Sequence, residues 1–184
     1  MKLVDIEKLV YKSQKGDEKS FAKLFDIFYE KIFRYIRFRV EENEIDDLVS
    51  KVFLKVVENL KKFSPQKNAG FNAWIFRVAH NTVIDYYRQK KEFLPIDPSD
   101  DAPYYIELED KSPTPNKVVN KNLDSKKIRE LLKKLSPAHR EILELKYLND
   151  FNNTEIAKIT DKSEGNVRVI QLRALREMRK LWPK

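Results

Sequence analysis

The chain has 184 residues, of which 41% are hydrophobic, and its 37 lysine and arginine residues outnumber 29 acidic residues to give a net charge of +8. It contains no cysteine, which excludes a disulfide scaffold, a thiolate metal site and a cysteine nucleophile. No apolar run approaches the roughly 20 residues needed to span a bilayer. We therefore expect a cytoplasmic protein with no membrane contact of its own.

Charge is sorted along the chain into three segments. Residues 1–91 carry a net charge of +6 and residues 117–184 a net charge of +8, whereas residues 92–116 carry −6 and five of the eight prolines. Repeated proline prevents a continuous helix, and like charges extend a chain by repulsion. The sequence predicts two basic domains, 1–91 and 117–184, joined by a flexible acidic Pro-rich linker at 92–116.

Apolar residues recur at spacings of three and four throughout the first domain, which predicts four helices and no strand. The first helix ends at Gly16, the second begins at Asp17, and the third closes at Ser64-Pro65 because proline disfavours the helical conformation of the residue before it. The third helix is marked by seven apolar residues at helical spacing: Ile45, Leu48, Val49, Val52, Phe53, Val56 and Leu60.

A loop from Lys62 to Gly70 leads into the fourth predicted helix, from Phe71 to about Lys91. Its inner stripe is expected to hold Trp74, Ile75, Val78, Ala79 and Ile84, and a separate polar stripe to hold Arg77, Asn81, Asp85 and Arg88. Aromatic residues at helical spacing are packing residues more often than stacking platforms, so core positions are predicted for Phe21, Phe28 and Trp74.

The second domain is also predicted to be all-α, in four helices. The first runs from Leu123 to Leu135, and the second begins with Ser136 as N-cap and Pro137 at the first helical position. A short helix over residues 153–159, a turn at 160–162 and a last helix from Ser163 to about Leu181 have helix-turn-helix spacing. The predicted core residues of the last helix are Val167, Ile170, Ala174, Leu175, Met178 and Leu181.

The outer face of the last helix is rich in arginine, with Arg168, Arg173 and Arg176 beside Val169 and Leu172. Arginine can pair with guanine or neutralise phosphate, and valine can contact a thymine methyl group, each good base contact contributing roughly 1 to 3 kcal/mol. This face therefore suits a DNA groove, although a solvated basic face is the plainer alternative.

In this order, the segments resemble the extracytoplasmic-function sigma factors, the two-domain members of the sigma-70 family. The first domain resembles sigma region 2 at Asp46-Asp47-Leu48-Val49 with Val52-Phe53, at residues 71–81 and at Ile84-Asp85. The second resembles sigma region 4 at residues 135–143, at Glu155-Ile156-Ala157 and at residues 163–168. The resemblance implies a protein that binds core RNA polymerase and directs it to promoters.

The resemblance also assigns sites. The third helix would bind the clamp coiled coil of the polymerase, and region 4 its flap, with polymerase contacts at Asp46, Asp47, Leu48, Val49, Val52 and Phe53. The loop at residues 62–70 and the helix after it would hold an unpaired base and the −10 element, through Lys62, Asn68, Asn72, Arg77, Asn81, Arg88, Lys90 and Lys91. The −35 element would meet Ser163, Glu164, Asn166, Arg168, Val169, Arg173 and Arg176.

Two further features follow from the resemblance. An anti-sigma factor is an expected partner, released under stress or by an envelope signal. The acidic linker could occupy the basic RNA path of the polymerase as an RNA mimic, or it could be acidic only because exposed linkers are polar.

Some positions depart from the family pattern. Ser50-Lys51 stands where relatives commonly have Gln-Glu, which puts a base on the polymerase-binding helix. Asp161 replaces a glycine and Lys162 an apolar residue in the turn, and Leu172 replaces a polar residue. Two alternatives therefore stay open: a stand-alone helix-turn-helix regulator and a sigma-like interaction protein without promoter activity.

Catalysis has no support in the sequence. The two histidines, His80 and His139, show no metal-ligand spacing, and adjacent side chains such as those of Asp46 and Asp47 diverge by about 100° on a helix. We expect no enzyme activity, no cofactor and no metal.

Overall fold

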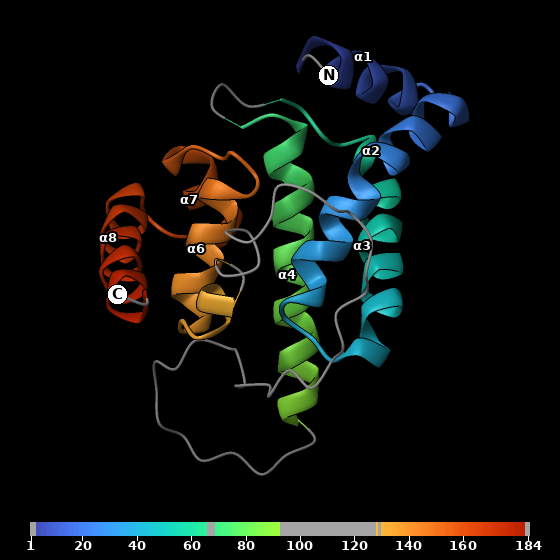
Figure 1. The fold of residues 1–184 in the computed structure, drawn as a ribbon. Helices are drawn as coiled ribbons and strands as arrows, with labels where there is room; N and C mark the ends of the chain where they lie inside the picture. Colours follow the sequence, from blue (N-terminus) through green and yellow to red (C-terminus); the bar gives the residue numbers. More distant parts are fainter. Residues whose placement is uncertain (1–2, 66–68, 93–127, 129, 183–184) are drawn as a thin grey trace, which may run out of the picture. The chain divides into compact units, whose positions relative to one another are not determined.

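The structure is a computed structural model that describes residues 3–65, 69–92, 128 and 130–182 (Figure 1). It confirms the predicted all-α class. Its elements are α1 (Leu3–Gln14), α2 (Glu18–Arg37), the 3-10 helix η1 (Glu42–Glu44), α3 (Ile45–Leu60), α4 (Phe71–Glu92), α6 (Pro137–Tyr147), α7 (Asn153–Thr160) and α8 (Glu164–Leu181). The helices form two compact units, one holding α1 to α4 and one holding α6 and α8. The predicted linker lies outside the described residues except for Glu92, as does the start of the helix predicted from Leu123.

Local signals place the start of α2 as predicted. Gly16, at φ +90°, turns the chain out of α1, and the Asp17 carboxylate accepts hydrogen bonds from the backbone N–H groups of Lys19 and Ser20 at 3.1 and 3.3 Å. The Ser20 hydroxyl also donates to this carboxylate at 2.8 Å and, as the main cause, lowers the pKa of Asp17. The capped end satisfies N–H groups that the helix itself leaves unpaired.

The end of α3 agrees with the prediction that residues 62–70 form a loop. The helix stops at Leu60, four residues before Ser64-Pro65, because Lys62 and Phe63 donate their N–H groups to the carbonyls three residues earlier. Such bonds tighten the last turn and end the α-helical pattern before proline acts.

The core of the first unit lies among α2, α3 and α4, with Phe28, Ile32, Val52 and Ala79 fully buried. The inward stripe of α4 was predicted only in part. Ile75 and Ala79 are buried as expected, but Trp74, Val78 and Ile84 are half-buried, and the buried set is completed by Phe71, Ala73, Phe76, His80, Thr82, Val83 and Tyr87. Helix α4 contacts α1, α2 and α3, and its Phe71 and Phe76 rings pack against Phe28 and Tyr35 of α2.

Tyr87 links α4 to the end of α2. Its buried hydroxyl donates a hydrogen bond to the backbone carbonyl of Arg39, and burial raises its pKa to about 12. The Arg39 guanidinium lies over the Tyr35 ring, 3.6 Å from the ring centre, and donates to the Tyr35 carbonyl. These contacts hold the two helices together at the end where the loop to α3 begins.

We expect Tyr87→Phe to lower the free energy of unfolding by about 1 to 3 kcal/mol, because it leaves a buried carbonyl without its donor. The raised pKa means that the unfolded state loses the Tyr87 proton first. Wild-type stability should therefore fall as the pH rises from 10 to about 12, and the variant should lack this part of the decrease. Urea unfolding at pH 7 and across this pH range measures both effects, and an unchanged stability at pH 7 would contradict the role of the hydroxyl.

The second unit packs α8 against α6. A buried cluster of Leu132, Leu135, Leu143 and Ala174 is flanked by Ile128, Met178 and Leu181. His139 Nδ1 lies 2.6 Å from a carboxylate oxygen of Glu177 across the two helices. Of the predicted α8 core residues, Val167 and Ala174 are fully buried, whereas Leu175 is 38% exposed. Leu175 lies outside the core because the inward stripe runs through residues 167, 170, 174, 178 and 181.

Candidate functional site

Helix α3 buries four of the six residues assigned to the polymerase. Leu48, Val49, Val52 and Phe53 are at most 7% exposed and pack in the core of the first unit. These four residues hold the helix in place, and in this conformation they offer a partner little surface. Their role as polymerase contacts stays a prediction. Asp46 and Asp47 are exposed.

The exposed face of α3 carries residues that have no counterpart among the predicted polymerase contacts. Leu54 is 59% exposed and Val57 is 51% exposed. One turn before Leu54 on the same helix, the Lys51 ammonium forms an ion pair with the Asp47 carboxylate at 2.6 Å. We call Asp46, Asp47, Lys51, Leu54 and Val57 the α3 outer face. The sequence contains a signal for this face, because Leu54 and Val57 are aliphatic residues that lie outside the apolar stripe of the amphipathic helix.

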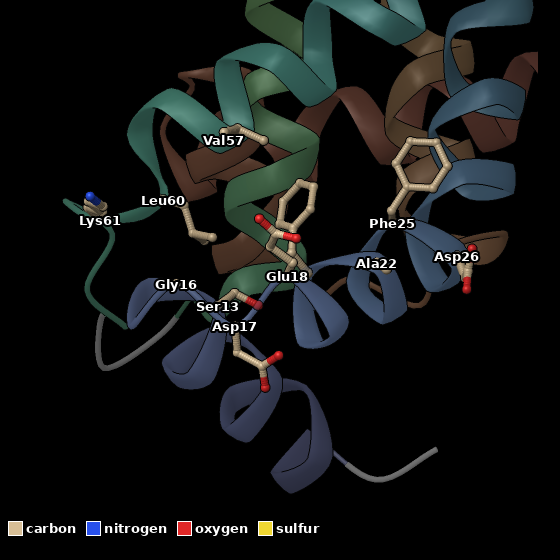
Figure 2. Close-up of a pocket in the computed structure, with 11 residues that line it drawn as sticks. Ser13, Gly16, Asp17, Glu18, Ala22, Phe25, Asp26, Val57, Leu60 and Lys61 are labelled. Carbon is tan, nitrogen blue, oxygen red and sulfur yellow. The ribbon is translucent and has the colours of Figure 1, made fainter.

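An open groove of about 400 Å³ continues from this face toward α2 (Figure 2). Its apolar lining includes Phe25, Val57 and Leu60. The carboxylates of Asp17, Glu18 and Asp26 lie on the side of α2, and Lys61 lies at the end of α3. Phe25 also contacts Phe53, with ring centres 4.5 Å apart, so the groove borders the core.

Three of the four residues predicted for the polar stripe of α4 are exposed, and the fourth, Asp85, is half-buried. Arg77, Asn81 and Arg88 are exposed and lie along one side of the helix at spacings of four and seven. Lys62, in the turn after α3, is also exposed. Asn68 lies outside the described residues, and so does the side chain of Lys91.

Asn72 is less available than predicted. It is half-buried in the first turn of α4, and its side-chain oxygen is buried with no hydrogen-bond partner among the residues that the structure describes. An unsatisfied buried oxygen costs free energy unless a donor reaches it. The Asn72 amide therefore cannot present both of its polar groups to a base edge in this conformation.

Lys90 is already engaged in the first unit. Its ammonium lies 3.0 Å from the Glu41 carboxylate and 3.3 Å from the Tyr86 hydroxyl, and the bond to Glu41 is the main cause of its raised pKa. The pairing keeps Lys90 protonated but offsets the charge that it can offer to a phosphate. A DNA phosphate that bound Lys90 would therefore compete with the Glu41 carboxylate for the same ammonium group.

We expect Glu41→Gln to raise promoter affinity about two- to fivefold, because it frees Lys90 and removes a nearby negative charge. Fluorescence anisotropy with the complete protein bound to core polymerase measures the change. Glu30→Gln is the matched control, since Glu30 is an exposed acid of α2 that lies near Arg34. An equal gain in both variants would assign the effect to net charge and contradict a specific role of Lys90.

The helix-turn-helix of the second unit forms as predicted. Asn152 and Glu155 cap α7 reciprocally, at 2.9 and 2.8 Å. Asp161 adopts the left-handed conformation, with φ 53°, and its N–H bonds to the Ala157 carbonyl. The Ser163 hydroxyl then accepts from the N–H of Asn166 at 3.1 Å and starts α8. Aspartate tolerates this backbone better than most residues, so the turn survives without glycine.

Glu164 joins the two helices of this motif. One carboxylate oxygen accepts from the Thr154 hydroxyl at 3.2 Å, and the other lies 2.5 Å from the Arg168 guanidinium. Both oxygens are therefore engaged, and Glu164 links α7 to α8 through its side chain. The resemblance assigns Glu164 to DNA contact, and its bond to Thr154 is a contact that the sequence does not predict.

The outward face of α8 carries most of the residues assigned to the −35 element. Ser163, Arg168 and Leu172 are exposed, the last at 52%. Four more exposed residues share a single stripe, which we call the α8 reading face: Asn166, Val169, Arg173 and Arg176. Their spacing of three, four and three residues lets them enter one groove together.

Within the described parts of the chain, no helix is both long and apolar enough to cross a membrane. The same parts contain no group of three or more histidine, cysteine or acidic residues placed to hold a metal ion.

These two units define an all-helical protein, with a helix-turn-helix in the second unit and exposed basic and apolar residues in the first. Comparison with known proteins specifies the class. Residues 24–93 match sigma-70 region 2 and residues 125–178 match sigma-70 region 4. The chain belongs to the sigma-70 family, as an extracytoplasmic-function RNA polymerase sigma factor.

Its similarity to individual relatives extends over both domains. It is 30% identical to the sigma factor NccH of Alcaligenes xylosoxydans xylosoxydans, over 91% of this chain and 90% of NccH. It is 27% identical to SigW of Bacillus subtilis over 95% of each protein. It is 26% identical to BldN of Streptomyces coelicolor over 95% of this chain, which spans 65% of BldN.

A solved structure shares the fold. CnrH, determined in complex with the cytosolic domain of CnrY, aligns over 96% of each chain with a TM-score of 0.66 and 20% identity.

Proposed function

We propose that this sigma factor binds core RNA polymerase through the α3 outer face and the adjoining part of α2, and that its second domain places the polymerase at the −35 element. The α8 reading face carries this proposal, because a capped helix-turn-helix presents two arginines, an asparagine and a valine outward along one stripe. These groups suit phosphates, base edges and a thymine methyl group.

The first domain would open the −10 element. Arg77, Asn81 and Arg88 form the exposed polar stripe of α4, and Lys62 adds a charge at the loop that precedes it. An unpaired strand needs a basic surface along its backbone and a pocket for a base. The proposed division is 1–91 for polymerase binding and −10 opening, 92–116 for the linker and 117–184 for −35 binding and flap contact.

An anti-sigma factor is proposed as a second partner. The exposed apolar residues Leu54 and Val57 lie beside a groove, and surfaces of this kind are commonly covered by a partner protein. An inhibitor that covered the α3 outer face would exclude polymerase until it was released. Co-purification of the tagged chain from its native host tests this partner, and the cytoplasm is the proposed location of all these contacts.

Reconstituted transcription tests the function. The purified chain is combined with sigma-free bacterial core polymerase and a library of promoter fragments, and the run-off products are sequenced. We expect a defined set of start sites that share two spaced motifs. Polymerase binding without transcripts would indicate an interaction protein. If the folded chain and the core enzyme of a close relative gave neither binding nor transcripts, the proposal would fail in favour of a stand-alone regulator.

A further inference from the structure

Three side chains are connected in series between α7 and α8, the two helices of the helix-turn-helix (Figure 1). The Thr154 hydroxyl donates to one carboxylate oxygen of Glu164 at 3.2 Å, and Nη2 of Arg168 donates to the other oxygen at 2.5 Å. Glu164 and Arg168 lie one turn apart on α8, whereas Thr154 lies on α7. Thr154 is therefore the member that ties the orientation of the pair to a second helix.

Local hydrogen bonds fix the backbone at both ends of this network. The capping pair of α7 closes the turn in which Thr154 lies, and the Ser163 hydroxyl caps the turn in which Glu164 lies. Between the helices, the Lys162 N–H bonds to the Ala157 carbonyl at 3.0 Å. The Thr154 hydroxyl thus reaches the Glu164 carboxylate from a fixed position.

Without Thr154, Glu164 and Arg168 would form an ordinary ion pair on the surface of a helix. Their side chains are 41% and 67% exposed, and exposed pairs hold their geometry weakly because solvent, salt and side-chain entropy oppose them. A carboxylate that also accepts a hydrogen bond from another helix has fewer orientations. The arginine that it holds then loses less conformational entropy when it binds a ligand.

The donors and the charge of Arg168 in this network suit a base better than a phosphate. Glu164 occupies one N–H of the guanidinium, and enough donors remain to pair with both O6 and N7 of a guanine. The adjacent carboxylate offsets the positive charge, so the pair gains little from counterion release at a phosphate. Arg168 starts about 100° around the helix from Val169, which places its long side chain beside the α8 reading face.

We propose that Thr154 is a positioning residue for recognition of the −35 element: through Glu164 it holds Arg168 in the orientation that pairs with one guanine. This inference rests on the function proposed above for the second domain. The residues predicted to meet the −35 element all lie between Ser163 and Arg176, so the network adds a contribution of α7 to sequence preference. Thr154 itself contacts no DNA in this proposal.

The test measures base preference at each position of the −35 element. A promoter recovered by the transcription assay supplies duplexes in which each base pair is replaced in turn, and the complete protein bound to core polymerase is titrated with them. Arg168→Ala identifies the base pair that Arg168 reads. Thr154→Val keeps the shape of the side chain without its hydroxyl, and Thr154→Ser keeps the hydroxyl. Thr82→Val is the matched control, because it removes a hydroxyl that donates to the Val78 carbonyl at 2.8 Å within α4.

We expect the wild-type chain to prefer guanine at one position by roughly 5- to 150-fold, and Arg168→Ala to remove that preference. Thr154→Val should lower the same preference about threefold or more, while its affinity for duplexes without that guanine stays within about twofold of wild type. Thr154→Ser and Thr82→Val should keep the wild-type preference within about twofold.

Salt dependence gives a second readout. Arg168→Ala should change the slope of log affinity against log salt by less than about 0.5, whereas loss of a phosphate contact would change it by about 1. Glu164→Gln should lower the guanine preference and steepen the slope by about 1, because it leaves the charge of Arg168 without its carboxylate partner. If Thr154→Val did not fold, Glu164→Gln would test the network at its second member.

A wild-type guanine preference in Thr154→Val would overturn the positioning role. An equal loss of affinity on every duplex would overturn it too, because that result indicates a general defect of the domain. A slope lowered by about 1 in Arg168→Ala, with equal losses on all sequences, would assign Arg168 to phosphate. A failure of the proposed function has a different signature: the wild-type chain would show no base preference anywhere in the element, and the inference would fail with it.

Discussion

Leu54→Asp should weaken binding to core polymerase by thirtyfold or more, the equivalent of about 2 kcal/mol. Leu54 is 59% exposed in the free chain, so the substitution should change the free energy of unfolding little. In the complex an aspartate at this position would lose its water without gaining a partner, and burial of an unpaired charge is costly. Titration of fluorescently labelled core polymerase with the full chain measures the affinity.

The matched control is Tyr11→Asp. Tyr11 lies on α1, is 62% exposed and receives the same acid in place of an exposed large apolar group. We expect its affinity for core polymerase to stay within about twofold of wild type. Equal losses in the two variants, or none in Leu54→Asp, would remove the α3 outer face from the polymerase interface.

Replacing both Arg173 and Arg176 with alanine should lower affinity for promoter DNA by roughly 30-fold or more at physiological salt. Each arginine is exposed on the α8 reading face and can supply a phosphate or base contact of about 1 to 3 kcal/mol. If both contact phosphate, the slope of log affinity against log salt should decrease by about 2. If one reads a base, the loss should instead be larger on the preferred sequence than on others.

Lys134→Ala provides the comparison for charge. Lys134 is an exposed cation of the same domain outside α8, and its removal should change affinity by less than about threefold. Binding is measured by anisotropy at several salt concentrations on promoter and scrambled duplexes. A double arginine variant that behaved like Lys134→Ala would show that the basic face of α8 is only solvated.

Helix boundaries were largely predictable because the signals that set them are local. Asp17, Ser163 and the Asn152–Glu155 pair each bond to backbone groups within three residues. Asp161 takes its left-handed conformation at the position where the turn was expected. These features follow from residues adjacent in sequence, and so the helix-turn-helix and the order of α1 to α4 could be derived without coordinates.

Assignment of the site was less complete, because periodicity shows that a helix has two faces but not how wide each face is. Phe53 and Leu54 are neighbours of similar hydrophobicity, yet the first is 7% and the second 59% exposed. Packing against α2 made that choice, since Phe53 contacts the Phe25 ring. Contacts with Tyr35 of α2 and with Arg39 just after it likewise bring Phe76 and Tyr87 into the core, whereas Leu175 lies outside the inward stripe of α8.

The sequence by itself determined the all-α class, the sigma-70 resemblance, the caps and the basic stripe of α8, because each rests on residue types at short spacing. Only the tertiary structure decided which side chains are engaged. Glu164 bonds to a threonine ten residues away, Lys90 to an acid 49 residues away, and Gln14 to carbonyls 46 and 49 residues away. Backbone carbonyls carry no residue-specific signal, so contacts of this kind appear only when folding brings distant segments together.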